Sequence, residues 1–378
     1  MKDNWKIHNL PDICDIKTGK RDANHAKPDG KYRFYTCASH HSLCDTFSFS
    51  GESVIVPGNG DIGLVFYYNG DFEAYQRTYV LNNIKIYPKY LYYHLYHNWR
   101  IINSDKKYGS TVRYVRMTNF LSYKIPVPPL EEQKRIVARI EELFSELDAA
   151  VATLERTKEQ LSVYRQAVLK EAFEGVYDAT DVVLGDLILE KPRNGYSPKG
   201  VEYETPFRNL TLTSTTGGVF KEGYFKYVDL DIDNKSYLWV KHNDILIQRA
   251  NTLEYVGTAV VYPGEDNRYV YPDLMMKCHL KEGINPYFIV HQLQSYKTRL
   301  YYQKNATGTA GSMPKINQKT VMQTPIIITD ISTQVKIVSE IESRLSVCDK
   351  IEETVTTALQ EAEAMRQSIL KQAFAGEL

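Results

Sequence analysis

Polar and basic residues gather in three loop-like stretches in each half of the sequence, and their side chains suit contacts to nucleic acid. Lysine, arginine and hydroxyl groups bind phosphate oxygens, whereas arginine, asparagine and glutamine can form paired hydrogen bonds with base edges. In the first half the candidate DNA-binding residues are Lys20, Arg21, Lys27, Lys31, Asn59, Gln76, Arg77, Lys106, Lys107, Ser110, Thr111 and Arg113. In the second half they are Arg193, Asn194, Tyr196, Lys199, Gln248, Arg249, Asn251, Thr252, Lys304, Asn305, Thr307, Thr309, Ser312, Lys315 and Asn317. Any single one could equally be a solvated surface side chain, so the prediction rests on the loops as groups.

The residue types that perform catalysis or hold a metal do not assemble into a site. The sequence has no glycine-rich dinucleotide motif and no phosphate-binding loop, and Val127 precedes Pro128-Pro129 where a methyltransferase tetrad needs a polar residue. Asp12 and Lys17 imitate a nuclease motif, but its two parts lie too close together to occupy adjacent strands. His40-His41 and His94/His97 have no matching Cys or His pair to complete a metal site. We therefore expect no catalytic residues, no metal and no cofactor bound by this chain.

Charge is distributed unevenly along a chain of 378 residues whose formal net charge is +0. Basic residues exceed acidic ones by six in residues 1–125 and by one in residues 177–325. Acidic residues are in excess by three in residues 126–176 and by four in residues 326–378. A DNA-binding chain carries positive charge on its recognition domains, and this pattern agrees with that, modestly for the second domain.

Cysteine usage and hydropathy indicate a cytoplasmic protein. The five cysteines form no Cys-x-x-Cys pair and are expected to be reduced thiols. No apolar run approaches the length of a membrane span, and the first ten residues are too polar for a signal peptide.

The polar loops need rigid elements to position them, and the sequence predicts two globules that contain both helices and strands. In the first, strands are expected at 32–37, 53–57, 64–68 and 79–87, followed by a helix at 90–102. In the second, strands are expected at 245–248 and 258–262, followed by a helix from 285 to about 300. The periodicities do not give the order of the strands.

Each globule is followed by a segment that predicts one long helix, at about 129–174 and about 332–376. Apolar residues in each segment alternate at steps of four and three, which is the pattern of a helix that pairs with another helix. At about 1.5 Å per residue, each helix would span about 65 Å. The predicted helix-pair interface consists of Ile136, Ile140, Leu143, Leu147, Leu154, Leu161, Val168, Ile337, Ile341, Ile351, Val355, Met365 and Ile369.

The two long segments repeat each other at a constant offset of 201 residues, which indicates an internal duplication. The offset pairs Gln133 with Gln334, Asp148 with Asp349, and Arg165-Gln166 with Arg366-Gln367. It also pairs Ala172-Phe173 with Ala373-Phe374 and Gly175 with Gly376, and no gap is needed. The partner of each long helix is therefore expected in the same chain.

The chain resembles the specificity (S) subunits of type I restriction–modification systems. The resemblance is carried by Pro126 to Gln133 at the start of the first long helix, by Lys170 to Gly175 at its end, and by the second copy, which ends at Leu378. Leu184 to Ile188, Pro206 to Leu210 and Asn243 to Asn251 fit more loosely. The second helix departs from the pattern because Ile326 to Gln334 lacks the double proline, which leaves its first residue undetermined.

The resemblance implies a non-catalytic, sequence-specific DNA-recognition subunit. Residues 1–125 and 177–325 would be α/β (α+β) target recognition domains, each reading one half of a bipartite, asymmetric site. Residues 126–176 and 326–378 would be long helices that pair as an antiparallel coiled coil, set the spacer and dock two methyltransferase (M) subunits. The expected partners are double-stranded DNA, the M subunits, which would bind S-adenosylmethionine, and restriction (R) subunits in the full complex.

A coiled-coil assembly scaffold without DNA readout is the alternative that the residues leave open. Salt dependence discriminates between the two, because DNA binding weakens steeply with ionic strength and hydrophobic helix pairing does not. A self-contained nuclease or methyltransferase is disfavoured by the missing motifs.

Overall fold

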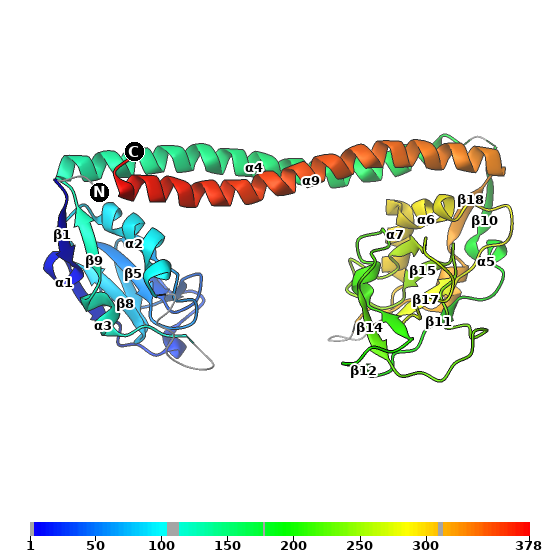
Figure 1. Ribbon diagram of the computed structural model, residues 1–378, viewed down its shortest axis with the longest axis horizontal. Coiled ribbons are helices and arrows are strands. Elements are labelled where there is room, and N and C mark those ends of the chain that lie inside the picture. The colour runs from blue at the N-terminus through cyan, green and yellow to red at the C-terminus, as the bar shows by residue number, and fades with distance from the viewer. Residues whose placement is uncertain (1–3, 104–112, 177, 309–312) are drawn as a thin grey trace. The chain divides into compact units, whose positions relative to one another are not determined.

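The computed structural model describes residues 4–103, 113–176, 178–308 and 313–378 (Figure 1). The chain divides into two compact units, Met1–Arg156 with Val355–Leu378, and Thr157–Thr354. Each unit combines one globule with part of each long helix. The long helices are α4 (Leu130–Glu174) and α9 (Ile331–Ala375), against the predicted 129–174 and 332–376. None of the described helices is both long and apolar enough to cross a membrane.

The globule of the first unit is built on an antiparallel four-stranded sheet in the order β2-β8-β5-β6. These strands span Asp15–Thr18, Thr78–Asn82, Glu52–Pro57 and Phe66–Asn69. A second sheet has the order β4-β3-β7, with β3 and β7 parallel, and spans Ser42–Cys44, Tyr32–Tyr35 and Phe72–Ala74. The remaining elements are the pair β1 (Lys6–Asn9) and β9 (Lys124–Val127), the helices α1 (Leu10–Ile13), α2 (Pro88–Asn103) and α3 (Met117–Leu121), and the turn η1 (Ala23–His25).

Helix α2 closes the core of this first globule. Its apolar face carries the buried residues Tyr90, Leu91, Leu95 and Trp99, which share one core with residues of β5 and β8. The first turns of α4 add Ile136 and further residues to the same core, so the long helix is part of the globule and not a separate rod.

The second globule repeats this plan on its own four-stranded sheet, in the order β11-β17-β15-β16. These strands span Arg193–Asn194, Met275–Cys278, Ile245–Gln248 and Ala259–Val261. The smaller sheet, β12-β14-β13, spans Gly200–Val201, Phe225–Val228 and Arg208–Leu210. The other elements are the pair β10 (Thr180–Val183) and β18 (Pro325–Ile328), the turn η2 (Leu212–Ser214), and the helices α5 (Leu184–Leu187), α6 (Pro286–Gln294), α7 (Tyr296–Asn305) and α8 (Gln318–Met322).

The late helix of the second globule differs from the prediction of one helix from 285 to about 300, because it is split at Ser295. The backbone of Ser295 is extended, with φ −63° and ψ 150°, and its hydroxyl donates a 2.7 Å hydrogen bond to the carbonyl of Gln292. Helix α6 therefore packs on the sheet with Phe288, Ile289 and Leu293, and α7 is a separate helix that adds Tyr302 to the same core.

Helix α9 begins at Ile331 without the double proline that precedes α4, and Asp330 supplies the cap instead. Its carboxylate accepts hydrogen bonds from the backbone N–H of Thr333, at 3.0 Å, and from the Thr333 hydroxyl, at 2.6 Å. These bonds stabilise the ionised carboxylate and lower the pKa of Asp330. Satisfying free N–H groups of the first turn with a side chain is an ordinary way to start a helix.

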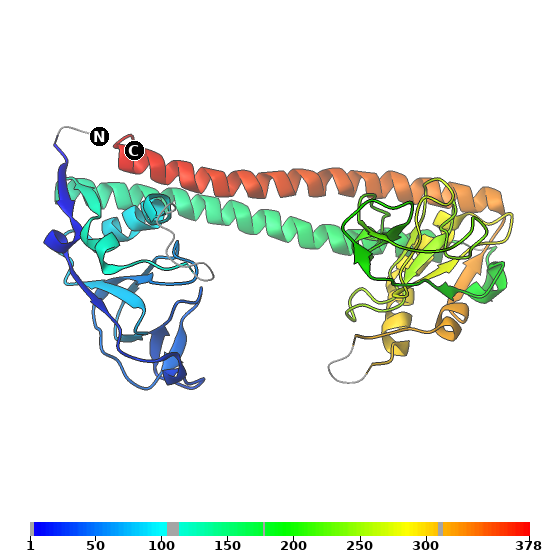
Figure 2. The same ribbon diagram turned by 60° about the horizontal axis from the view of Figure 1, so that its bottom comes forward.

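Helices α4 and α9 lie side by side and run in opposite directions within each unit (Figures 1 and 2). The C-terminal turns of one helix pack on the globule beside the N-terminal turns of the other. In the first unit the ring of Phe374 packs against Tyr90 of α2, with ring centroids 5.5 Å apart. In the second unit Phe173 packs against Phe288 of α6, also at 5.5 Å. Both contacts use the position that the 201-residue offset relates.

Candidate nucleic-acid interfaces

In the first globule the chain leaves the central strand β5 through a loop that two neighbouring segments hold in place. The N–H of Gly58 donates to the carbonyl of Arg77 at 2.8 Å, and its carbonyl accepts from Val115, also at 2.8 Å. The N–H of Gly60 donates to the carbonyl of Arg113 at 3.0 Å. A Cβ atom at position 58 would lie 2.3 Å from the Arg77 carbonyl oxygen, so only glycine allows this close approach.

This arrangement brings four predicted DNA-binding residues of the first globule together, namely Asn59, Gln76, Arg77 and Arg113. The side chains of Gln76, Arg77 and Arg113 are exposed, and Asn59 is half-buried. Asn59, Gln76 and Arg77 also line a cavity of about 370 Å³. The strand end thus presents hydrogen-bonding groups of the kind that bind base edges and phosphates.

The second globule holds the loop after its central strand β15 in the same way. The N–H of Arg249 donates to the Leu274 carbonyl at 2.8 Å, and the Arg249 carbonyl accepts from Ile316 at 2.9 Å. The N–H of Asn251 reaches the Pro314 carbonyl at 3.3 Å. Positions 249 and 251 therefore correspond to 58 and 60 of the first globule, with different side chains.

Two further predicted residues join the second loop, because Lys315 forms bridges to both Ala250 and Thr307. The backbones of Thr307 and Lys315 exchange hydrogen bonds at 2.8 and 2.9 Å. The Arg249 guanidinium lies over the neighbouring segment and donates to the Asp273 carbonyl at 3.3 Å. The second interface consequently combines Arg249, Asn251, Thr307 and Lys315.

The prediction that Gln248 contacts DNA is wrong. The residue is fully buried, and its amide nitrogen donates to the Leu212 carbonyl and to the hydroxyls of Thr215 and Thr216 at 2.9–3.1 Å. Its amide oxygen accepts from the side chain of Asn251 at 2.7 Å. Gln248 therefore shapes the loop from inside and has no atom left for a base edge.

Three other candidate residues make hydrogen bonds that hold the globules together. The guanidinium of Arg21 binds the buried carboxylate of Glu73, with the Nε and Oε2 atoms 3.3 Å apart. Asn317 caps α8 by accepting from the Thr320 N–H at 2.9 Å, and Asn305 donates to the Tyr301 carbonyl, also at 2.9 Å. Their role is at least partly structural.

The remaining candidates differ in whether their side chains are ion-paired, half-buried or exposed. Lys27 is paired with Asp45, and Arg193 with Glu190 at 3.0 Å. Asn194 is half-buried on β11. Side chains that are exposed are those of Lys20, Lys31, Tyr196, Lys199, Thr252 and Lys304. Residues outside the described part of the chain are Lys106, Lys107, Ser110, Thr111, Thr309 and Ser312.

Sequence reasoning missed two tyrosines, Tyr79 and Tyr114, that line the cavity beside Arg77. The sequence predicts for Tyr79 only a place in a strand. Tyr114 lies between Arg113 and Arg116 in the sequence, and an aromatic residue between two arginines is a signal that could have drawn attention to it.

The interface between the long helices follows the predicted pattern in α4 and departs from it in α9. Ile136, Ile140, Leu147, Leu161 and Val168 are buried, and Leu143 and Leu154 are half-buried. In α9, Ile341, Val355 and Ile369 are buried and Ile337 is half-buried.

The predictions for Ile351 and Met365 are wrong, because these side chains are 39% and 55% exposed. One set of buried positions in α9 recurs every seven residues, as Ile341, Cys348, Val355, Ala362 and Ile369. Between them, Glu352 and Arg366 take the half-buried positions that Ile351 and Met365 were expected to fill.

Ion pairs occupy these half-buried positions in both units. In the second unit Arg165 of α4 binds Asp349 at 2.6 Å and Glu352 at 3.0 Å. In the first unit Arg366 of α9 binds Asp148 of α4, and its guanidinium lies 4.6 Å from the centre of the Phe144 ring. The two arginines are related by the 201-residue offset, and so are the two aspartates.

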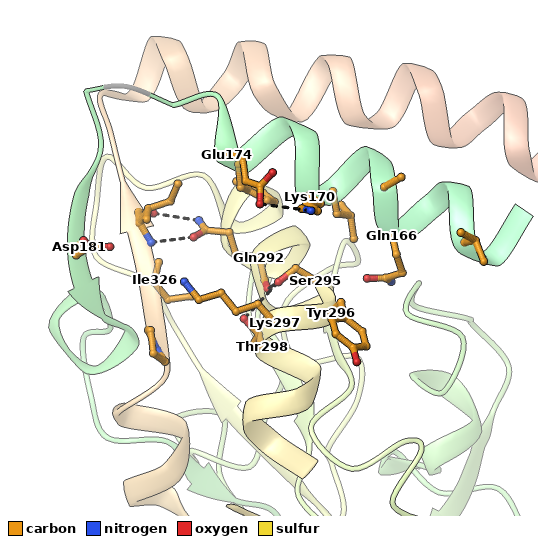
Figure 3. Close-up of a pocket in the computed structure, with 16 residues that line it drawn as sticks. Gln166, Lys170, Glu174, Asp181, Gln292, Ser295, Tyr296, Lys297, Thr298 and Ile326 are labelled. Atoms are coloured by element: carbon orange, nitrogen blue, oxygen red, sulfur yellow. Dashed lines mark hydrogen bonds and ion pairs between the residues drawn. The ribbon is translucent and has the colours of Figure 1, made fainter. Parts of the chain in front are cut away.

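The second globule also contains a larger cavity of about 550 Å³, bounded by α4, β18 and the start of α7 (Figure 3). Its lining is largely apolar, and Lys170 lies 3.8 Å from Glu174. The Gln292 amide closes one side by exchanging hydrogen bonds with the backbone of Ile327 at 2.8 and 3.0 Å. Among the described residues that line it, Lys170 and Lys297 are the cations, and Lys170 is paired with Glu174. Phosphate binding favours a cluster of free cations, so the candidate interfaces are the loops at 58–60 after β5 and 249–251 after β15, which we call the strand-end loops.

A family model described as the type I restriction modification DNA specificity domain matches residues 2–161. The chain is 27% identical over 410 residues to the type I restriction enzyme EcoDI specificity subunit of Escherichia coli, and the match covers 99% of this chain and 88% of that protein. It is 26% identical to the EcoKI specificity subunit of Escherichia coli K12, over 71% of this chain and 61% of that protein. These relatives do not favour a scaffold without DNA readout.

Two solved structures share the fold at 16% sequence identity. One comes from a study of complex assembly and conformational transition of the type I R-M system, with a TM-score of 0.74 over 100% of this chain and 99% of the other. The other is the HsdS subunit of Thermoanaerobacter tengcongensis, with a TM-score of 0.53 over 100% and 98%. The predicted fold class, globules of mixed helices and strands with two long antiparallel helices, is confirmed.

Proposed function

Because this chain belongs to the specificity subunits of type I restriction–modification systems, we propose that each of its globules reads one half of a two-part DNA site. The chain is the non-catalytic subunit that recognises DNA sequence, and its partners are DNA and the other subunits of such a system. The strand-end loops are the parts of the globules that we assign to the reading.

One observation carries the proposal: the same backbone construction occurs twice and presents different side chains. The first globule offers Asn59, Gln76 and Arg77, and the second offers Arg249, Asn251 and Lys315. Direct readout depends on which donors and acceptors face the base edges. Two loops with different donors and acceptors should read different sequences, so the complete site is expected to be asymmetric.

The unequal charge of the globules supports different contributions to DNA binding, with more phosphate contacts in the first globule and more dependence on base contacts in the second. The first has six more basic than acidic residues and the second has one more. Contacts between cations and phosphates release counterions, so they supply affinity that depends on salt and not on sequence. The first globule should therefore contribute more of the salt-dependent affinity, and the second should depend more on its direct contacts to bases.

The paired helices give the complex its other functions in this proposal. Their length sets the spacer between the two half-sites, and they dock two M subunits. Those M subunits bind S-adenosylmethionine and methylate adenine, and R subunits join the core to complete the restriction complex. The repeat supports two docking events, because the same helix–helix ion pair and the same helix–globule ring contact occur once in each unit.

The experiment that tests the proposal is a methylome determined by single-molecule sequencing. Cells would carry the neighbouring M subunit with and without this chain. A gapped two-part motif that is methylated only when this chain is present would name both half-sites. Absence of a new motif, with the M subunit shown to be active alongside a different specificity subunit, would reject DNA readout by this chain.

A further inference from the structure

The cavity beside the first strand-end loop is a built recess. Gly58 and Val115 form its backbone floor, and both are buried and hydrogen-bonded to each other across the loop. Its volume of about 370 Å³ is in the range of pockets that bind a small organic group. The close approach of Gly58 to the Arg77 carbonyl fixes the recess in shape, because any side chain at position 58 would force the two segments apart.

Two tyrosines form aromatic walls of this recess, and each is held by a neighbour outside it. The ring of Tyr79 packs on Phe120, with ring centroids 4.2 Å apart. The hydroxyl of Tyr114 accepts a 3.0 Å hydrogen bond from Arg116, whose guanidinium lies 5.5 Å from the Tyr114 ring centre. Aromatic side chains that are positioned in this way bind flat, π-rich groups by stacking.

The polar members of the lining have hydrogen-bonding capacity to spare. Gln76 and Arg77 are exposed and have no side-chain partner among the residues that the structure describes. The side-chain oxygen of Asn59 is buried and also lacks a partner within the described ranges. Together these three residues offer donors from a guanidinium and donors and acceptors from two amides, which is the set that recognises the edge of a nucleobase.

Resting on the function proposed above, we propose that this recess binds one nucleobase of the first half-site after that base has left the duplex stack. Tyr79 and Tyr114 lie against the faces of the base, and Gln76 and Arg77 bind its edge. A base that stays stacked shows only its groove edge, which protruding side chains reach more easily than a recess does. Proteins that take a base out of the stack hold it in such an aromatic-walled pocket.

The first part of the test asks whether the lining sets sequence preference. This chain and its M subunit would be expressed as wild type, Gln76→Ala, Arg77→Ala and Lys124→Ala, and the methylated motif of each would be sequenced. Lys124 is an exposed cation of the same unit that does not line the cavity. We expect both cavity variants to lose discrimination at one and the same base of the first half-site, on the order of 10-fold. The second half-site and the Lys124→Ala motif should match wild type.

The second part asks whether that base is unstacked. The purified complex would be mixed with a duplex that carries, at the identified position, a fluorescent base analogue whose emission rises when it leaves the stack. We expect a several-fold rise with wild type and little rise with Tyr114→Ala. Unchanged motifs in Gln76→Ala and Arg77→Ala, or emission that stays quenched in the wild-type complex, would overturn the recess as a base pocket. If the wild-type complex methylated no two-part motif, the proposed function itself would fail, and that result is distinct from both.

Discussion

Gln133 and Gln334, which lie 201 residues apart, make the same two hydrogen bonds in the two units. Each amide oxygen accepts from the backbone N–H just before a globule helix, from Tyr87 at 2.8 Å and from Asn285 at 2.9 Å. Each amide nitrogen donates at 2.7 Å to the carbonyl five residues earlier in its own chain segment, that of Pro128 or Thr329. The duplication has therefore preserved the hydrogen bonds that hold each long helix against its globule, as well as a sequence pattern.

Replacing either glutamine with alanine should destabilise its own unit. Gln133 and Gln334 are 3% and 1% exposed, and truncation leaves a part-buried backbone N–H and a backbone carbonyl without their side-chain partners. The expected cost is about 1–3 kcal/mol for each variant, measured by urea unfolding. Gln160→Ala is the matched control, because Gln160 is exposed on α4 and its loss should change the unfolding free energy by no more than about 0.5 kcal/mol. Equal stabilities of Gln133→Ala and the control would show that the Gln133 hydrogen bonds do not stabilise the contact between α4 and the first globule.

Gln248 is fully buried and its neighbour Arg249 is half-buried, so replacing each with alanine should have a different effect. Arg249→Ala removes a half-exposed guanidinium from the second interface and should relax one position of the second half-site by about 1–3 kcal/mol while the fold is kept. Gln248→Ala removes the acceptor of Asn251 and leaves the Leu212 carbonyl and two hydroxyls without their buried donor. It should lower the unfolding free energy of the second unit and weaken the whole second half-site.

Methylome sequencing and urea unfolding of both variants would separate the two effects. An Arg268→Ala control removes an arginine that is paired with Glu222 in the same unit, and it should leave the motif unchanged. A Gln248→Ala protein with normal stability and a single relaxed base would restore Gln248 as a base-contacting residue.

The long helices could be predicted from sequence because their signal is local and repeated. Seven-residue spacing and helix-start chemistry depend on residues near one another in the chain, and the constant offset appears when two such local patterns are compared. The choice between adjacent registers in α9 failed at Ile351 and Met365, because apolar character favoured them over Glu352 and Arg366. Burial of those two charged residues becomes acceptable only through partners on α4, Arg165 and Asp148, and such partners are not visible within one helix.

The loop residues that contact DNA could not be predicted from sequence, for a different reason. Asparagine, glutamine and arginine serve equally well at a base edge and inside a loop, and the residue type does not distinguish them. Gln248 became structural because η2 brings the Leu212 carbonyl and two threonine hydroxyls beneath β15. That approach joins segments more than thirty residues apart, so sequence patterns could not have revealed it. The same holds for the split at Ser295.

Stability of the first unit should fall as the solution becomes acidic, in part because of His94. The side chain is 4% exposed, lies against Phe374 and bonds through Nδ1 to the Tyr123 hydroxyl at 2.9 Å. Burial, and secondarily the nearby His97, lower its pKa to about 3. In the unfolded chain the imidazole titrates near its ordinary value of about 6.5, so the unfolded state binds the proton first as the pH falls.

The contribution of His94 to the free energy of unfolding is therefore fully present above about pH 6.5 and is lost progressively down to about pH 3. Between about pH 7 and about pH 5 this contribution should fall by about 2 kcal/mol. Unfolding free energies at both values, for wild type and His94→Phe, would measure it, and the variant should show the smaller difference. His40→Phe is the control, since His40 is exposed. A variant with the same pH dependence as wild type would exclude His94 as a source.

The length of the helix pair should determine the number of base pairs between the two half-sites, and a matched deletion in both helices tests this. Residues 154–160 of α4 and 354–360 of α9 lie between the ion-paired positions in each helix, so removing both keeps Arg165, Asp349, Arg366 and Asp148. A deletion of seven residues keeps the seven-residue register of the helix-pair interface and shortens each helix by about 10 Å. At about 3.4 Å per base pair, the preferred spacer should become shorter by about three base pairs while both half-sites stay the same.

Methylome sequencing of cells that carry the deletion variant with the M subunit would show the new motif. Deleting three residues from each helix at the same place is the control, because it breaks the seven-residue register of the helix-pair interface. This variant should abolish methylation without defining a new spacer. If the seven-residue variant methylated the wild-type spacing, the distance between half-sites would be set by the globules or the M subunits, and not by the length of the helix pair.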